Sequence, residues 1–201
     1  MYQFIESIRI ENGNAPLIEY HQHRYNQCLN KHFKHAEAVQ LSHIADKHTN
    51  KQGTWKLRIE YDHKIRNINC IPYRPRRIKR FHLVYDDQID YAWKYSNRKA
   101  FEKLKSRYHE DDEIIIIKNK LITDSSYANL AFYATPYWYT PKHPLLKGVM
   151  RQYLLDHNSI KTANITTDQL KQFEFFCQIN AMLDIDTSEK YSTGDILPYK
   201  I

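Results

Sequence analysis

Residues 113–130 read EIIIIKNKLITDSSYANL, and they contain the longest purely aliphatic run of the chain, Ile114 to Ile117. Isoleucine is β-branched and favours strands. The Lys-Asn-Lys turn that follows, together with the apolar stretch at residues 121–123, predicts a β-hairpin. Further short strands are expected at residues 130–133 and 138–140, so this part of the chain is predicted to consist mainly of strands.

Helices are expected on both sides of this hairpin. Residues 96–109 and 145–156 carry apolar side chains at helical spacing, and residues 173–178 predict a closing strand. In the front half, the expected strands cover residues 2–10, 15–18, 55–61, 65–71 and 81–85, and the expected helices cover residues 19–35 and 36–47. The strand at 15–18 is inferred from Asn12-Gly13, a strong hairpin signal.

These elements predict an α+β fold with two domains. A small N-terminal α+β domain is expected over residues 1–90 and a second domain over residues 91–201, with the boundary near residues 86–93. The hydrophobic fraction of 42% in 201 residues is that of a folded globular protein. No stretch has the roughly 20 apolar residues of a membrane helix, and no secretory signal is visible, so a cytoplasmic protein is expected.

The net charge of +7 raises the possibility of a nucleic-acid partner. The densest basic cluster, residues 74–80, is interpreted as a solvated loop before the next strand, because no DNA- or RNA-binding motif accompanies it. The remaining basic residues are interleaved with Asp and Glu. A basic protein can equally serve anionic small molecules, so charge alone does not decide the partner.

Metal and glycine-loop chemistry receive little support. His21, His23, His32 and His35 could be imagined as a metal cluster, but no carboxylate or cysteine stands at a suitable spacing, and no metal site is expected. The three cysteines are far apart and indicate neither a disulfide framework nor a zinc site. With four glycines and no glycine-rich phosphate loop, a phosphate site would have to use helix N-termini and arginine side chains.

Four separated fragments gain weight from their order along the chain. They are ESIRIENG (6–13) with HQHR (21–24), KYSNR (94–98), LITDSSYANL (121–130), and YTP (139–141) with GVMRQ (148–152) and INAML (179–183). In this order the set resembles the class IV aminotransferase family of fold-type-IV pyridoxal 5′-phosphate (PLP) enzymes, and within it the aminodeoxychorismate lyases. The resemblance covers residues 4–186 and implies a fold like that of D-amino-acid aminotransferase. That fold has a small N-terminal α/β sandwich domain, here shortened at its N-terminus, and a β-rich C-terminal domain.

The resemblance implies a catalytic lysine and a carboxylate behind the cofactor. Lys94 matches the lysine that the family attaches to PLP, and its amine can later serve as general base and acid. Asp124 matches the family glutamate that faces the pyridine nitrogen, with a side chain one methylene shorter. A carboxylate there keeps the ring protonated and preserves its capacity as an electron sink. Asn129 matches a supporting position behind the cofactor.

The remaining matched residues concern the phosphate. Arg24 matches the family's phosphate arginine, and the backbone amides of Val149 and Met150 match the helix terminus that binds the anion. Met150 stands where many members have a hydroxyl residue. Asn180 and Ala181 match the loop that closes the phosphate site from the other side.

The function implied by the resemblance is conversion of 4-amino-4-deoxychorismate to 4-aminobenzoate and pyruvate, a step toward folate. An anionic, amino-acid-like substrate and a homodimer are implied as well, and nucleic acid is not. The alternative within the family is an aminotransferase acting on branched-chain or D-amino acids. A cofactor-free nucleic-acid-binding or interaction protein on a degenerate form of the fold is the alternative from another class.

Overall fold

The computed structural model describes residues 3–198 as two compact units. The first unit comprises residues up to Pro75 together with Trp93–Asn97, and the second comprises Arg76–Ala92 and the chain from Arg98 onward. The backbone therefore passes from one unit to the other three times. No helix among residues 3–198 is long and apolar enough to cross a membrane.

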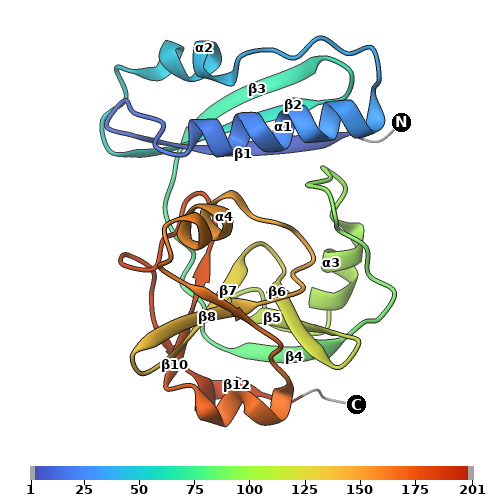
Figure 1. The fold of residues 1–201 in the computed structure, drawn as a ribbon, viewed down its shortest axis with the longest axis vertical. Helices are drawn as coiled ribbons and strands as arrows, with labels where there is room; N and C mark the ends of the chain where they lie inside the picture. The colour runs from blue at the N-terminus through green and yellow to red at the C-terminus, as the bar shows by residue number, and fades with distance from the viewer. Residues whose placement is uncertain (1–2, 199–201) are drawn as a thin grey trace. The chain divides into compact units, whose positions relative to one another are not determined.

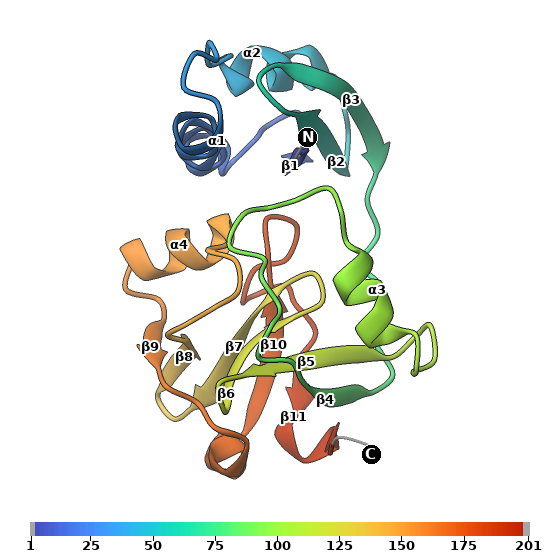
Figure 2. The same ribbon diagram turned by 90° about the vertical axis from the view of Figure 1, so that its right-hand side faces the viewer.

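The first unit is a three-stranded antiparallel sheet with helices on one face (Figures 1 and 2). In the order β1-β2-β3 the strands are Phe4–Glu11, Thr54–Tyr61 and Ile65–Pro72; the helical elements are α1 (Ile18–His32), α2 (Leu41–Ala45) and the 3-10 turn η1 (Asp46–His48). Alternate residues of β1 and β2 pack against α1 and α2. Their buried core consists of Phe4, Ile8, Ile10, Tyr25, Cys28, Leu29, Leu41, Ile44, Ala45, Leu57, Ile59 and Tyr61.

A short extended segment completes the open edge of β1. The amide of Ile5 donates to the Lys94 carbonyl at 2.9 Å, and the amide of Ser96 donates to the Gln3 carbonyl at 2.9 Å. Phe4 and Tyr95 form the bridge between these two bonds. The expected helix at 96–109 is therefore too long. Residues 94–96 bond to β1 instead of forming helix, and α3 spans only Lys99–Lys105.

The second unit is a nine-stranded mixed sheet that curves around its own core (Figure 2). Its strands are β4 (Phe81–Tyr85), β5 (Glu113–Lys118), β6 (Leu121–Ser125), β7 (Asn129–Ala134), β8 (Tyr137–Pro141), β9 (Lys161–Ala163), β10 (Phe175–Ile179), β11 (Tyr191–Ser192) and β12 (Ile196–Leu197). Most follow the order β11-β10-β7-β6-β5-β4-β12, with β8 between β7 and β9. The helical elements are α3, α4 (Val149–Asp156) and the 3-10 turns η2 (Thr167–Gln172) and η3 (Thr193–Asp195).

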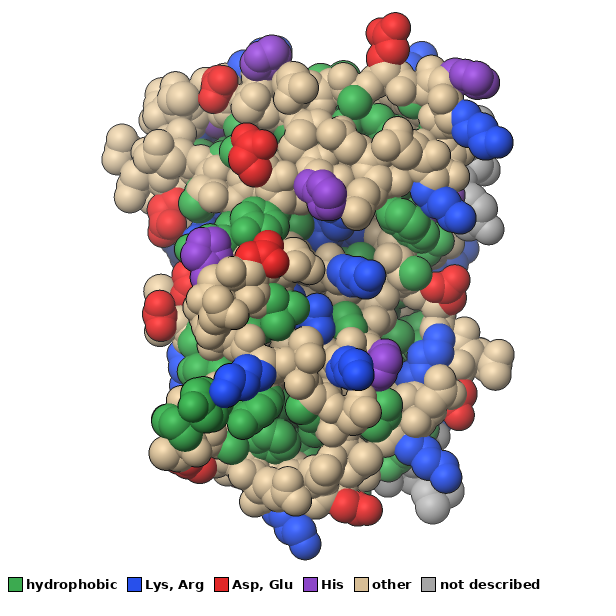
Figure 3. All heavy atoms as spheres, in the orientation of Figure 1, with side chains coloured by type: hydrophobic (Ala, Val, Ile, Leu, Met, Phe, Trp, Pro, Cys, Tyr) green, Lys and Arg blue, Asp and Glu red, His purple; other side chains and the backbone are tan. Residues whose placement is uncertain are grey.

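Apolar side chains hold the second unit together inside and also gather on one part of its surface. Ile115 and Ile117 of β5 are fully buried, and they meet Phe132 of β7 and Phe176 of β10 in the core. Figure 3 shows apolar groups gathered on the outside near the β7–β8 hairpin, where Tyr137 is 47% exposed. On the same face, Lys and Arg are interspersed with Asp and Glu.

Together, the sheets and helices confirm the predicted α+β class, but several expected elements are wrong in detail. No strand forms at 15–18. The Asn12 amide donates to the Gly53 carbonyl. Gly13 has φ +82°, and any other residue at this position would have its Cβ 2.2 Å from the Thr49 carbonyl oxygen. The turn is thus tied to the chain before β2, and the backbone enters α1 at Ile18.

The helices at 36–47 and 145–156 are also shorter than expected. Residues 36–40 are not helical, and α2 begins at Leu41. The second of these helices begins at Val149, and the residues before it form a loop in which the Leu146 amide donates to the Asp124 side chain at 2.9 Å.

Candidate active site

The first unit buries a carboxylate among two basic side chains of α1. Glu6 lies on the apolar face of β1 and is fully buried. Arg24 donates to it twice, from Nε to Oε1 at 2.9 Å and from Nη2 to Oε2 at 2.5 Å. Burial alone would raise the pKa of Glu6, but Arg24 and His21 outweigh it and hold the pKa at about 2. Glu6 is therefore ionised and fixes the guanidinium of Arg24 in a bidentate pair.

His21 is the third member of this network. Its Nδ1 lies 2.6 Å from Glu6 Oε2, and burial lowers the pKa of the imidazole. Since an ionised carboxylate can only accept, the proton of the neutral ring sits on Nδ1. The other nitrogen, Nε2, is then an acceptor, and within residues 3–198 it has no hydrogen-bond partner. His21 thus belongs to a charge network, and it joins no metal cluster among the described residues.

Lys94 lies in the same unit, on the segment that pairs with β1. Its backbone is fixed by the bond from Ile5, the residue before Glu6. Its side chain is half-buried, and its charge contributes to lowering the pKa of His21. The structure therefore brings the charge of Lys94, on the segment paired with β1, close to His21 and Arg24 on α1.

The second unit holds Asp124 in a frame of hydrogen bonds. Asn129 Nδ2 donates to Asp124 Oδ1 at 2.8 Å and also to the Leu146 carbonyl at 2.8 Å. The Leu146 amide donates to Asp124 Oδ2 at 2.9 Å. Asp124 and Asn129 face each other because β6 and β7 pair at this position. Both residues are thereby fixed to the loop that leads into α4.

Burial has the largest influence on the pKa of Asp124. It raises the pKa to about 6, against the bonds from Leu146 and Asn129 and the charge of Arg151, which lower it. A carboxyl group with a pKa near 6 titrates close to neutrality, and perturbed groups of this kind cluster at functional sites. The carboxylate accepts from the Asn129 side chain and from the amides of Leu145 and Leu146, which leaves one of its four acceptor sites for a ligand.

The N-terminus of α4 is packed directly against this frame. Gly148 precedes the helix, and a Cβ there would lie 2.0 Å from Asn129 Oδ1. No side chain caps the helix, and both Val149 and Met150 are buried. The first amides of a helix lack partners within it and carry the positive end of its dipole. This end of α4 can accordingly bind an anion beside the Asp124 carboxylate.

Asn180 and Ala181 lie in the turn after β10. The Met182 amide donates to Asn180 Oδ1 at 2.8 Å, and Asn180 Nδ2 reaches the Tyr127 carbonyl at 3.4 Å. Tyr127 belongs to the turn between β6 and β7, the strands that carry Asp124 and Asn129. The loop after β10 therefore contacts this turn. The eight predicted residues thus form two groups, with Arg24 and Lys94 in the first unit and the other six in the second.

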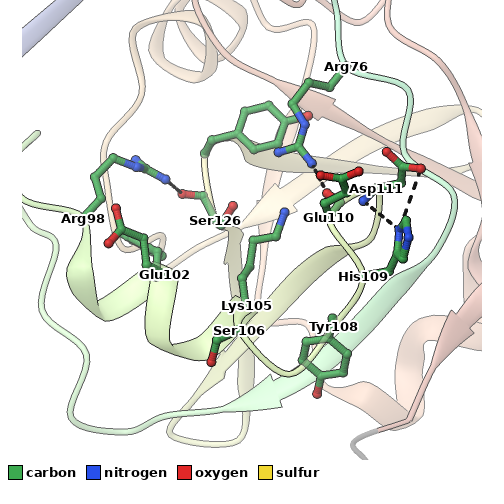
Figure 4. Close-up of a pocket in the computed structure, with 12 residues that line it drawn as sticks. Arg76, Arg98, Glu102, Lys105, Ser106, Tyr108, His109, Glu110, Asp111 and Ser126 are labelled. Atoms are coloured by element: carbon green, nitrogen blue, oxygen red, sulfur yellow. Dashed lines mark hydrogen bonds and ion pairs between the residues drawn. The ribbon is translucent and has the colours of Figure 1, made fainter.

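A pocket of about 750 Å³ opens on the other side of that β6–β7 turn, and none of the eight predicted residues lines it (Figure 4). In its wall, Arg98 donates to the Ser126 carbonyl at 2.5 Å and Arg76 donates to the Glu110 carbonyl at 2.7 Å. Beneath it, the buried Glu113 attracts Lys105 and Arg76 at 3.6 and 3.7 Å. Its basic groups are therefore already engaged with acceptors of the protein.

Comparison with known proteins identifies the family. The amino-transferase class IV model matches residues 3–185. The chain belongs to the class IV aminotransferase family. An uncharacterized protein of Haemophilus influenzae (strain Rd) is 35% identical over 185 residues, which are 90% of this chain and 98% of that protein. Members of this family are PLP-dependent enzymes.

Two solved structures show the same fold. A protein of Haemophilus somnus 129PT, provisionally named 4-amino-4-deoxychorismate lyase, is 35% identical with a TM-score of 0.85, covering 92% of this chain and 98% of that one. A hypothetical aminotransferase of Mycobacterium tuberculosis in its PLP-bound form is 14% identical with a TM-score of 0.72, covering 94% of this chain and 79% of that one.

The residues of the second unit fit the cofactor of the class IV family. An uncapped helix N-terminus offers donors for a phosphate, Gly148 leaves no side chain in front of it, and a buried carboxylate stands in the same frame. Sequence reasoning gave no role to Glu6 or Arg151, and it considered His21 only as part of a metal cluster that it did not expect. For Glu6 a signal existed, since a charged residue that falls in phase with Phe4, Ile8 and Ile10 on a strand requires a buried partner.

Proposed function

We propose that this chain is a PLP-dependent lyase that converts 4-amino-4-deoxychorismate to 4-aminobenzoate and pyruvate. The observation that carries the proposal is the frame around Asp124, which ties a buried carboxylate to the loop beginning α4. Such a frame offers an acceptor for a ring nitrogen and donors for a phosphate at a fixed separation. The choice of a lyase is supported by the 35% identity with the Haemophilus somnus protein that bears this name.

Every matched residue has a role in this proposal. Arg24 and the amides of Val149 and Met150 bind the phosphate, and Asn180 and Ala181 close the site around it. Asp124 holds the proton of the ring nitrogen, with Asn129 fixing its orientation. Lys94 supplies the amine that bonds to the cofactor. The basic surface suits an anionic, amino-acid-like substrate, and the family resemblance leads us to expect a homodimer.

The chain's own groups then move the protons. PLP, when bound, supplies an electron sink for the charge that develops on the carbon next to the substrate amine. The free amine of Lys94 would remove the proton from that carbon. The carbon–oxygen bond to the enolpyruvyl group breaks, its oxygen leaves with the electron pair, and a proton taken up by this group gives pyruvate. The substrate ring becomes aromatic, and no oxidant or keto acid is consumed.

The decisive experiment is turnover of 4-amino-4-deoxychorismate by the PLP-loaded protein without any keto acid. We expect 4-aminobenzoate and pyruvate in equal amounts over many turnovers. Lys94→Ala should abolish turnover, whereas Lys103→Ala, an exposed lysine of α3, should retain it. Circular dichroism of both variants controls for folding.

An aminotransferase would behave differently. It leaves the amine on the cofactor and needs a keto acid to regenerate it, so steady turnover only with added 2-oxoglutarate would refute the lyase and favour an enzyme for branched-chain or D-amino acids. Full activity of the Lys94→Ala protein would refute the assignment of the lysine.

A further inference from the structure

Arg151 is a buried arginine with no direct acidic partner. It lies in the first turn of α4, directly after Val149 and Met150, and is 5% exposed. Its Nη2 donates to the Pro141 carbonyl at the end of β8, at 2.9 Å. Within residues 3–198, its Nε has no hydrogen-bond partner and no carboxylate lies within ion-pair distance. A guanidinium in such a position is costly, because its charge has lost water without gaining a contact ion pair.

The charge that acts on Arg151 belongs to Asp124, which is itself buried without a contact cation. Burial lowers the pKa of Arg151, and the attraction of Asp124 raises it again. Toward Asp124, the other groups of the frame are uncharged: the side-chain amide of Asn129 on β7, and the backbone amides of Leu145 and Leu146. Arg151 is the charged side chain with the largest effect on this carboxyl group.

We propose that Arg151 is a positioning residue that keeps Asp124 ionised across the frame while anchoring the first turn of α4 to β8. Two buried opposite charges that do not touch still attract strongly, because little water screens them. The bond to the Pro141 carbonyl ties the guanidinium to the end of β8, and Arg151 occupies none of the acceptor sites of the Asp124 carboxylate. Asp124 thereby keeps its negative charge and one acceptor site that no group of the frame uses. The catalytic meaning of this arrangement rests on the proposed function; the electrostatic coupling does not.

The coupling can be measured in the cofactor-free protein. The Asp124 side-chain carbon is followed by NMR through a pH titration of ¹³C-labelled protein, and Asp124→Asn assigns its signal. Arg151→Met, which keeps the volume and removes the charge, should raise the midpoint of Asp124 by about one unit or more. Arg151→Lys should raise it by less. The matched control is Lys142→Met, an exposed cation beside Pro141, which should leave the midpoint unchanged.

A second measurement needs no substitution of Arg151. In the wild-type protein the ¹⁵N signal of the Arg151 Nε–H should shift with the same midpoint as Asp124, and the shift should vanish in Asp124→Asn. This keeps the proposal testable even where Arg151→Met does not fold. An unchanged Asp124 midpoint in a folded Arg151→Met protein, or an Arg151 signal that ignores the Asp124 titration, would overturn it.

The pH–rate profile of the PLP-loaded protein tests this proposal separately from the proposed function. The acid limb of the pH–rate profile should move upward in Arg151→Met, with activity regained at higher pH, and Arg151→Lys should retain most of the wild-type profile. A variant that is slower at every pH without a moved limb would show a merely structural role and refute the proposal. If wild-type protein binds no PLP, the proposed function fails while the titrations still decide the coupling.

Discussion

At the scale of single residues, several charged side chains are held by partners inside the protein. Arg24 is the first case, because two of its five donors are already taken by Glu6. If Arg24 also binds the phosphate, Arg24→Ala removes a charge-assisted bond worth about 1.5–3 kcal/mol, so PLP affinity should fall roughly 10- to 150-fold. Equilibrium binding of PLP measures this.

The affinity for pyridoxal, which lacks the phosphate, should change far less. Arg58→Ala, which breaks an Arg–Glu pair on β2 of the same sheet, is the matched control and should bind PLP normally. Because a lone buried Glu6 destabilises the fold, the double variant Arg24→Met with Glu6→Gln serves where the single variant unfolds. Equal losses for PLP and pyridoxal would remove Arg24 from the phosphate site.

Glu6 should also make the stability of the first unit sensitive to acid. Its pKa is about 2 in the folded protein and near 4.5 when unfolded, so its contribution is complete above pH 4.5 and is lost as the pH falls toward 2. The shift corresponds to about 3 kcal/mol. The difference in unfolding free energy between wild type and Glu6→Gln should therefore shrink by about this amount between pH 5 and pH 2.

Urea unfolding at a series of pH values checks this, with Glu60→Gln as the control. Glu60 pairs with Arg58 at the surface, where ion pairs contribute little, so its difference from wild type should vary by less than about 1 kcal/mol. A wild-type minus Glu6→Gln difference that stays constant with pH would mean that the carboxyl group has an ordinary pKa.

At this scale, a family motif brings residues together in the prediction, whereas contacts between residues far apart along the chain were not predicted. Asp124 and Asn129 were predicted as neighbours of the cofactor, and the structure joins them by a hydrogen bond. Glu6 and Arg24 are 18 residues apart, and only the pairing of β1 with α1 shows that they touch. Arg151 was quoted within its motif, but periodicity does not reveal that its guanidinium is buried.

At the scale of elements, the junction between β7 and α4 is packed without spare room. Gly148 has an ordinary extended backbone, φ −70° and ψ 146°, so its need for glycine is purely steric. In Gly148→Ala the new Cβ would collide with Asn129, which must then release Asp124 or Leu146. We expect a loss of about 1–3 kcal/mol in unfolding free energy, together with weaker PLP binding.

Thermal unfolding and PLP titration measure both effects. Gly194→Ala is the control, since a Cβ there meets only Ser192 Oγ at an ordinary 3.4 Å. Adding Asn129→Ala to Gly148→Ala relieves the collision, so the two losses should not add. Strict additivity of the two substitutions would show that Asn129 and Gly148 do not interact.

Strands were predicted better than helices because their signal is local. Residues 54–61 and 113–118 alternate or are β-branched, and both form strands. Several helix ends were misplaced, and the turn at Asn12-Gly13 forms as predicted but is not followed by the expected strand, because distant groups also bind these segments. These groups are Gln3 and Ile5 for the segment before α3, Asp124 for the loop before α4, and Gly53 for the turn.

At the scale of the whole molecule, binding of a cofactor should be visible as stability. A ligand at 100 times its Kd stabilises the folded state by about 2.7 kcal/mol, which for a chain of this length raises Tm by roughly 5–10 °C. PLP should produce such a rise, and pyridoxal at the same concentration a smaller one. No rise at saturating PLP would contradict cofactor binding.

The route of the backbone has a consequence for anyone who wishes to cut this protein into pieces. The segment 93–97 belongs to the first unit, although the chain on either side of it belongs to the second. A polypeptide ending at Pro75 would lack this segment and leave the backbone groups of Gln3 and Ile5 unpaired along an open strand edge. Open edges recruit other chains, so such a fragment would be prone to aggregate in an expression host. A soluble fragment would need residues 93–97 grafted back through a linker.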